Sequence, residues 1–265
     1  MTTYLSGQSP IINVMTRAIQ KATTGLVRDF GELENLQVSK KGPKDFVSAA
    51  DLRSEKIISE ELIKARPDFG LLLEESGEIK GNDPEHTWIV DPLDGTKNFL
   101  HGNPHFAISI ALKKGDDIIS AATYSPIHDE MFIAEKGRGA FLNNRRIRVS
   151  GRNDLSMTVL GTGLHKLPEN GPHKYWELEK MNALTSGIRC LGSATLDLAY
   201  VACGRLDGMW ARALQPWDLA AGMLLISEAG GSFKALSRDA SPLVTNDIIA
   251  SNGSLTTALD KHLRS

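Results

Sequence analysis

The chain has 265 residues, of which 41% are hydrophobic and 23% are charged, and its net charge at pH 7 is −2. This composition is typical of a globular protein with a substantial core, and the small charge gives no indication of bulk attraction to nucleic acid or to a membrane surface. No apolar run approaches the length of a membrane span, residues 1–10 do not resemble a signal peptide, and two cysteines do not indicate a disulfide framework. We therefore expect a cytoplasmic protein.

The first part of the chain predicts two long helices. Ser9 and Pro10 are typical of a helix N-cap and of the first helical residue, and apolar side chains then recur at helical spacing as far as Leu26. Asp51 precedes a second amphipathic stretch that continues through Leu62. Taken alone, Asp51 is interpreted as the N-cap of this second helix.

Short apolar runs then predict a sheet that is mostly antiparallel. The run 71–73 is typical of a buried strand and ends at Glu74, whereas the polar residues 76–86 are interpreted as a loop. Further strands are expected at 106–112, 118–124 and 131–134, followed by a hairpin that turns at Asn143–Asn144. Four arginines near this hairpin indicate a solvated face or, less favoured, a surface for an anionic partner: Arg145, Arg146, Arg148 and Arg152.

Between these strands, the stretch Trp88–Phe99 ends an apolar run with two carboxylates three residues apart. Asp91 and Asp94 enclose Pro92, which lacks an N–H and fixes its own φ, so the chain is expected to leave the sheet here. Gly95 follows and allows a close approach of backbone to ligand. Two ionised carboxylates about 4 Å apart repel by roughly 4 kcal/mol at an effective dielectric near 20. Three interpretations are open. The two carboxylates share a proton, they bind a hard cation, or they are simply solvated aspartates in a turn.

Beyond about residue 150, strands and helices alternate. A strand at 187–191 leads through Gly192-Ser193-Ala194 into a helix, and the free N–H groups of such a turn can face a polar ligand. Asp218 stands at the start of a further helix that runs to Ala229, and taken alone it is typical of an N-terminal cap. The fragment 161–163 lacks the third glycine of a dinucleotide fingerprint, so a Rossmann site is not expected.

The candidate ligands are all oxygen donors at the ends of predicted elements: Glu74, Asp91, Asp94 and Asp218. No cluster of cysteine or histidine accompanies them. His101 and His105 are four residues apart, but a glycine and a proline between them break any helix. This donor set is suited to Mg²⁺ and argues against zinc.

Three motifs carry a resemblance to a known family. The string D-P-L-D-G-T-K-N-F after W-I-V, the later Trp217–Gly222 and the upstream Leu73–Ser76 are similar to the motifs of the inositol monophosphatase family of Mg²⁺-dependent phosphatases. The resemblance implies an α/β fold with an α+β first lobe, built as a layered α-β-α-β-α sandwich of the inositol monophosphatase and sugar phosphatase type. It also implies a homodimer and inhibition by Li⁺. Two lobes are expected. The first, residues 1–150, would carry most of the metal ligands, and the second, residues 151–265, would carry Asp218 and the substrate contacts.

The resemblance also implies roles for individual residues. One Mg²⁺ is assigned to Glu74, Asp91 and the backbone carbonyl of Leu93, and a second to Asp91, Asp94 and Asp218, with a third ion held largely by water near Glu74. Two metals can clamp the attacking and the leaving oxygen of an in-line displacement. Catalytic roles fall to Thr96, Asp51 and Glu74, because Thr96 backed by Asp51 orients the attacking water.

Substrate contacts are expected at both motifs and at the turn before the 194–202 helix: Asp94, Gly95, Thr96, Gly192, Ser193, Ala194, Ala211 and Asp218. In the family, a lysine at the position of Lys40 points toward the metal site. Many members carry a glutamate at the position of Ala211, where it contacts inositol hydroxyls. Alanine has no acceptor, so the phosphatase chemistry is expected to be intact while selectivity for inositol is open.

The function expected from these residues is Mg²⁺-dependent hydrolysis of a small phosphate monoester, with inositol 1-phosphate as the leading substrate. The alternatives are another small substrate, such as histidinol phosphate, a sugar phosphate or a nucleotide 3′-phosphate. A different class of function is a non-enzymatic partner in transcription and ribosomal RNA maturation, for which the arginines at 145–152 are the only support. Membrane partners are not expected, and nucleic acid is the less favoured partner.

Overall fold

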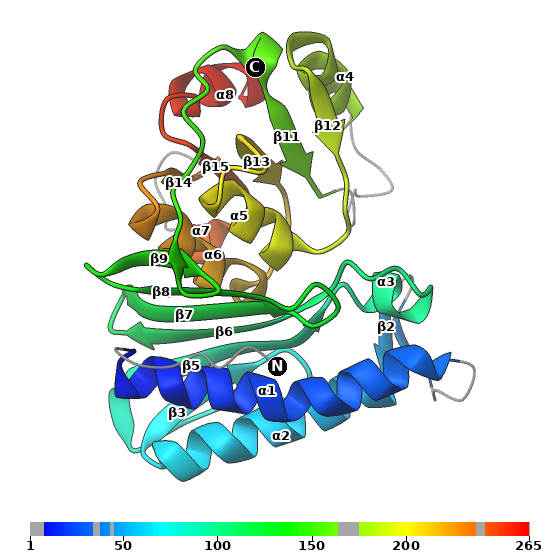
Figure 1. Ribbon diagram of the computed structural model, residues 1–265, viewed down its shortest axis with the longest axis vertical. Coiled ribbons are helices and arrows are strands. Elements are labelled where there is room, and N and C mark those ends of the chain that lie inside the picture. The colour runs from blue at the N-terminus through cyan, green and yellow to red at the C-terminus, as the bar shows by residue number, and fades with distance from the viewer. Residues whose placement is uncertain (1–7, 34–37, 43–44, 164–174, 237–241, 265) are drawn as a thin grey trace.

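The computed structural model describes residues 8–33, 38–42, 45–163, 175–236 and 242–264. Its elements form five layers, which Figure 1 shows from bottom to top. Helices α1 (Pro10–Gly31) and α2 (Ala49–Ala65) cover one face of a large sheet. Helices α5 (Ala194–Ala202) and α6 (Pro216–Glu228) separate this sheet from a smaller one, whose outer face carries α4 (Tyr175–Leu184) and α8 (Thr256–Leu263). The predicted layered α/β sandwich is confirmed.

The larger sheet has eight strands within the described residues, in the order β10-β9-β8-β7-β6-β5-β3-β4. Neighbouring strands are antiparallel except for the parallel pair β3 and β5. The strands are β3 (Phe69–Leu73), β4 (Gly77–Ile79), β5 (Asp83–Asp94), β6 (Ala107–Lys114), β7 (Asp117–Ser125), β8 (Glu130–Glu135), β9 (Gly139–Leu142) and β10 (Arg145–Arg146). The largely antiparallel first sheet was predicted from the short links between apolar runs.

The smaller sheet has five strands among the described residues, in the order β12-β11-β13-β15-β14. Strand β11 is parallel to both of its neighbours, whereas β15 is antiparallel to β13 and to β14. The strands are β11 (Val159–Thr162), β12 (Gly187–Arg189), β13 (Gly208–Ala211), β14 (Ser232–Ala235) and β15 (Ile248–Ser251). The remaining elements are the hairpin β1 (Val38–Gly42) with β2 (Asp45–Ser48), the short helices α3 (Thr96–Leu100) and α7 (Pro242–Thr245), and a 3-10 turn at Leu155–Met157.

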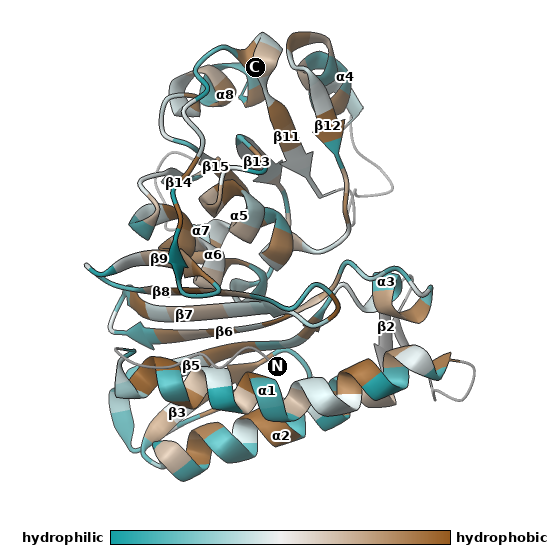
Figure 2. Ribbon diagram, in the orientation of Figure 1, coloured by the Kyte–Doolittle hydropathy of each residue, from teal (hydrophilic) through white to brown (hydrophobic). Residues whose placement is uncertain are grey.

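Helix α1 forms as its sequence predicts. The Ser9 hydroxyl accepts a hydrogen bond from the N–H of Ile12 at 3.3 Å, and Pro10 begins the helix. Its apolar stripe, including Met15 and Ile19, is fully buried against the sheet. Figure 2 shows the resulting alternation of hydrophilic and hydrophobic bands along α1 and α2.

Three local expectations are wrong. Helix α2 begins at Ala49, so Asp51 lies inside its first turn and is not its N-cap. Residues 76–86 are not a loop, because they contain β4 and the start of β5. The chain also does not leave the sheet at Pro92: β5 continues to Asp94 with a register irregularity between Asp91 and Asp94. A proline is tolerated at such a β-bulge because the bulged residue makes no ladder hydrogen bond.

The proposed division at residue 150 stays a prediction. Helices α5 and α6 follow that residue in sequence, yet α6 packs on β6 and β7 of the larger sheet. The apolar side chains between the layers therefore come from both halves of the chain, for example Phe132, Leu198 and Leu225. Among the described helices, none combines the length and the apolar composition that a membrane crossing requires.

Candidate metal centre

Three carboxylates converge at the bulge in β5. Asp91 and Asp94 lie on either side of it, and Asp218 comes from the first turn of α6. One carboxylate oxygen from each residue lies within 4.8 Å of the others. Asp91 is buried, whereas Asp94 and Asp218 are half-buried. The bulge explains how two aspartates three residues apart on one strand serve the same site, because a regular strand would alternate their directions.

Glu74 joins this group from the neighbouring strand. It follows β3, which pairs in parallel with β5 so that Leu73 is opposite Val90, and the Glu74 N–H donates to the Val90 carbonyl at 3.3 Å. Burial raises the pKa of the Glu74 carboxyl to about 8; its hydrogen bond with Asp91 opposes this, and the charges of Asp218, Glu75 and Asp94 add to it. Burial, followed by the charge of Glu74, also raises the pKa of Asp91 well above its ordinary range.

The residues present fit a hard cation. The Glu74 Oε2 atom is buried and has no hydrogen-bond partner among the residues that the structure describes, which is costly for an acceptor unless a cation or a proton satisfies it. The raised pKa values of Glu74 and Asp91 reflect the same need, since buried carboxylates without a counter-charge favour their protonated forms. All the donors are oxygens. Among the described residues, no histidine or cysteine belongs to a metal-ligating group.

Helix α2 holds both segments that carry the ligands. The Ser54 hydroxyl donates to the Pro92 carbonyl at 2.8 Å, inside the bulge. The Glu55 carboxylate accepts from the Glu75 N–H at 2.8 Å and from the Ser76 hydroxyl at 2.5 Å, which fixes the end of β3. Sequence reasoning missed Ser54 and Glu55. The signal was their helical spacing from Asp51, which places three polar side chains on one face of an otherwise packed helix.

The predicted pair Thr96 and Asp51 is brought together. The Thr96 hydroxyl lies 3.0 Å from Asp51 Oδ1 and 3.2 Å from the Leu93 carbonyl, so its single proton has two acceptors within reach. Asp51 is fully buried in the first turn of α2. The Leu93 N–H in turn donates to Asp91 Oδ1 at 3.0 Å, which fixes the carboxylate at the bulge.

Two glycines allow the surrounding loops to approach closely. Gly95 has φ +94°, and a Cβ there would lie 3.1 Å from the His105 carbonyl oxygen. Gly192 has φ +88°, and a Cβ there would lie 2.9 Å from Asn98 Nδ2. The same Nδ2 atom donates to the carbonyls of His105 at 2.7 Å and of Leu191 at 2.8 Å. Asn98 therefore holds the segment after β12 against the segment after β5.

Behind these loops, His105 packs against residues of α5. Its ring meets the Tyr200 ring edge-on with 5.6 Å between centroids, and its Nε2 lies 3.7 Å from Asp197 Oδ1. Burial raises the pKa of Asp197 to about 6, and this rise is opposed by His105.

Two of the predicted substrate residues, at the start of α5, are buried. Ser193 is the N-cap of α5 and is fully buried, and Ala194 beside it is also buried. The Ser193 hydroxyl donates to Asp94 Oδ2 at 2.6 Å. Thr195, which sequence reasoning missed, donates to the same oxygen from its N–H and from its hydroxyl, each at 2.7 Å. Its only sequence signal was a hydroxyl residue in the first turn of a predicted helix.

Asp218 serves its own helix as well as the carboxylate group. It is the third residue of α6, and its Oδ2 accepts from the Gln215 N–H at 2.6 Å in a capping box. The helix therefore fixes one oxygen of this carboxylate.

Ala211 lies at the end of β13 and is buried, with 1% of its surface exposed. The neighbouring Arg212 donates to Asp247 Oδ2 at 2.9 Å and forms an ion pair with Glu177. Its guanidinium thus links α4 to the residue that immediately precedes β15, and it is not a ready replacement for a hydroxyl-binding side chain at 211. The expected contact from Lys40 falls on a side chain outside the described part of the chain.

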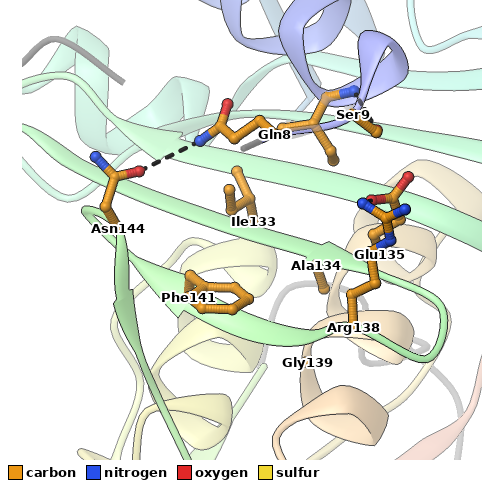
Figure 3. A pocket seen from close by; sticks show the side chains of 10 residues that line it. Gln8, Ser9, Ile133, Ala134, Glu135, Arg138, Gly139, Phe141 and Asn144 are labelled. Carbon is orange, nitrogen blue, oxygen red and sulfur yellow. Dashed lines mark hydrogen bonds and ion pairs between the residues drawn. The ribbon is translucent and has the colours of Figure 1, made fainter. Parts of the chain in front are cut away.

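A separate cavity of about 420 Å³ lies between the start of α1 and strands β8 and β9 (Figure 3). Ile133 and Phe141 form its apolar floor. Gln8 and Asn144, which are hydrogen-bonded to each other at 3.3 Å, close one end, and Glu135 and Arg138 form an ion pair at the other. None of the candidate ligands lines this cavity.

Comparison with known proteins gives a consistent result over nearly the whole chain. A model described as "Inositol monophosphatase family" matches residues 7–265. Inositol-1-monophosphatase of Rhizobium meliloti is 53% identical over 253 residues, which cover 95% of each chain. Nus factor SuhB of Xylella fastidiosa is 44% identical over 227 residues, covering 84% of this chain and 81% of that protein. The crystal structure of extragenic suppressor protein suhB from Bartonella henselae has a TM-score of 0.93 at 52% identity, covering 97% of this chain and 99% of that one.

Proposed function

Because the chain belongs to the inositol monophosphatase family and is a phosphomonoester hydrolase, we propose that it hydrolyses inositol 1-phosphate to inositol and phosphate with Mg²⁺ as its cofactor. The observation that supports the metal most directly is the buried Glu74 Oε2 atom, which lies beside three further carboxylates and has no partner within the described part of the chain. A group of carboxylates of this kind does not stabilise the fold on its own, because its negative charges repel one another. Li⁺ is proposed to inhibit the enzyme.

The residues proposed to hold Mg²⁺ are Glu74, Asp91, the carbonyl of Leu93, Asp94 and Asp218. When bound, such ions lower the pKa of water and neutralise charge on a phosphate ester and its leaving oxygen. Asp91 interacts electrostatically with both Glu74 and Asp94 and is proposed to be shared by two ions. The raised pKa values of Glu74 and Asp91 mean that these carboxyls lose their protons as the cations bind.

The remaining steps fall to groups of the chain itself. The Thr96 hydroxyl is proposed to orient the attacking water and to accept its proton while the Thr96 proton moves toward Asp51 Oδ1, 3.0 Å away. The backbone N–H groups of Gly95 and Thr96 are proposed to bind the phosphate oxygens. The backbone of Gly192, Ser193 and Ala194 is proposed to face the inositol ring, because the Ser193 hydroxyl is already used by Asp94.

Selectivity among phosphate esters is proposed to be modest. Residue 211 has no hydroxyl acceptor, and the guanidinium of Arg212 is engaged by Glu177 and Asp247. Histidinol phosphate, sugar phosphates and nucleotide 3′-phosphates therefore stay as alternative substrates. The test is phosphate release from a panel of these esters with Mg²⁺ and with a chelator. Release from inositol 1-phosphate only with Mg²⁺ is expected; no release from any ester would contradict the proposal.

A second candidate function is a role as a partner in transcription. It is favoured by the relative named Nus factor SuhB and by three exposed arginines at the edge of the larger sheet, Arg145, Arg146 and Arg148. The test is co-purification with the transcription machinery. If a triple alanine variant of these arginines loses co-purification but retains phosphate release, the role in transcription is separate from the enzymatic activity. We further propose that the protein is a cytoplasmic homodimer. Measuring its size in solution tests whether it is a dimer.

A further inference from the structure

Asp94 is held by one of its two carboxylate oxygens. Oδ2 accepts three hydrogen bonds, from the Ser193 hydroxyl at 2.6 Å and from the N–H and hydroxyl of Thr195 at 2.7 Å each. Both donor residues are fully buried, whereas Asp94 itself is half-buried. Among the residues that the structure describes, none donates a hydrogen bond to Oδ1. The two oxygens of one carboxylate therefore have different surroundings.

The donors belong to the start of α5, which lies in the layer between the sheets. Ser193 caps this helix, since its hydroxyl also accepts from the Leu196 N–H at 3.4 Å. The Thr195 N–H is in the first turn and has no partner within the helix. Asp94, from the other side of the site, supplies the acceptor that this N–H needs, and its negative charge is favourable at a helix N-terminus. The contact spans about a hundred residues of sequence, 94 to 195.

We propose that Ser193 and Thr195 are positioning residues that bind Asp94 through Oδ2 and so present Oδ1 to the cation; this inference rests on the proposed function. Without these donors, repulsion from Asp91 and Asp218, whose oxygens lie within 4.8 Å, would favour turning the carboxylate away from the centre. Groups that orient a metal ligand in this way contribute to metal affinity without touching the metal. Thr195 is the informative member, because its backbone N–H is retained in every variant.

The test uses variants that remove or keep one hydroxyl group and leave the rest of the fold unchanged. Thr195→Val removes one donor and keeps the side-chain shape, whereas Thr195→Ser keeps the donor. Thr256→Val is the matched control, since Thr256 is also buried and its hydroxyl lies 2.7 Å from the Ser251 hydroxyl, at the start of α8 on the smaller sheet. It therefore loses a comparable buried hydrogen bond away from the carboxylates.

The measurement is calorimetric titration of each folded variant with Mg²⁺ alone, with circular dichroism to check the fold. Thr195→Val is expected to bind Mg²⁺ about ten-fold more weakly than the original chain, while Thr195→Ser and Thr256→Val stay within about two-fold. In phosphate release, the Mg²⁺ concentration for half-maximal rate is expected to rise by the same factor in Thr195→Val, and excess Mg²⁺ is expected to restore the rate.

Equal affinities of Thr195→Val and Thr256→Val would overturn the inference while leaving the proposed function intact. If Thr195→Val does not fold, Ser193→Ala takes its place, and Mg²⁺ affinity equal to that of the original chain overturns the inference in the same way. An original chain that binds no Mg²⁺ would overturn the proposed function and this inference together.

Discussion

The Thr96 hydroxyl lies 3.0 Å from Asp51 Oδ1, although 45 residues separate the two in sequence. Thr96 begins the short helix after the β5 bulge, and Asp51 is buried in the first turn of α2. The buried carboxylate has its geometry fixed by a helix, so it can hold the hydroxyl in one orientation. This contact is the basis of the first prediction.

Replacing Thr96 by valine is expected to lower kcat by about 10²–10⁴, the range for loss of general base catalysis, because the isosteric side chain cannot orient water or transfer a proton. Thr96→Ser keeps the hydroxyl and is expected to retain most of the activity. Steady-state phosphate release at saturating Mg²⁺ measures the difference. Equal activity of the valine and serine variants would exclude a chemical role for this hydroxyl.

Asp91→Asn is expected to abolish turnover and to stabilise the metal-free protein at pH 8. Asparagine retains the oxygen that accepts from the Leu93 N–H and removes the charge next to Glu74 and Asp94. Each unit by which the pKa of a carboxyl is raised represents about 1.4 kcal/mol of unfavourable interaction of its ionised form. Urea unfolding in the presence of a chelator measures stability. A variant that turns over at ordinary Mg²⁺ would contradict the shared-ligand assignment.

The metal-free protein is expected to lose stability as the pH rises from about 5 to 8. The pKa of Glu74 is raised from 4.5 to about 8, so the folded state binds a proton that the unfolded state has released across this window. The stabilisation is complete below the unfolded pKa and is lost through the folded pKa, with a slope of about 1.4 kcal/mol per pH unit for one proton.

Urea unfolding at several pH values, with chelator and with saturating Mg²⁺, measures this dependence. Glu74→Gln is the control and is expected to make the slope between pH 6 and 8 shallower, because it removes one of the two carboxyls whose pKa is raised. Mg²⁺ is expected to reverse the loss, since it binds the deprotonated carboxylates. Stability that rises over this range in the metal-free protein would show that Glu74 ionises readily without a cation.

Gly95→Ala is expected to destabilise the protein and to reduce activity. At φ +94° an L-residue is strained by about 1–3 kcal/mol, and the new Cβ would lie 3.1 Å from the His105 carbonyl oxygen. Gly137→Ala is the matched control, because Gly137 has φ +78° and open space at its Cβ. Thermal unfolding is expected to show a larger loss for Gly95→Ala, and only that variant is expected to lose activity.

Ala211→Glu tests the substrate preference. A glutamate would restore a charged hydroxyl acceptor, and one such hydrogen bond is worth about 1.5–3 kcal/mol, or roughly ten-fold or more in kcat/KM. The expected result is a higher kcat/KM for inositol 1-phosphate relative to glycerol 2-phosphate. Because Ala211 is buried, circular dichroism must show that the variant folds. An unchanged ratio in a folded variant would mean that residue 211 does not contact the substrate.

Several parts of this protein were determined by local sequence. Helix α1 follows from Ser9, Pro10 and a 3.6-residue apolar period, and the antiparallel strands of the larger sheet follow from short apolar runs with short links. The family, the layered fold and the carboxylates around the β5 bulge follow from a motif in which Asp91 and Asp94 are only three residues apart. Short-range patterns of this kind encode dihedral preferences and ligand types, which are properties of neighbouring residues.

Only the tertiary structure decided how these groups are held. The bulge at Pro92 depends on pairing with β6, and Ser54 reaches the Pro92 carbonyl from a helix 38 residues earlier. Thr195 meets Asp94 because α5 is packed between two sheets, and nothing in the sequence near either residue indicates the other. Such contacts depend on how separate elements pack. The site is assembled from β3, β5, α2, α5 and α6, so local motifs determine which residues are its ligands, whereas the fold determines how those ligands are oriented.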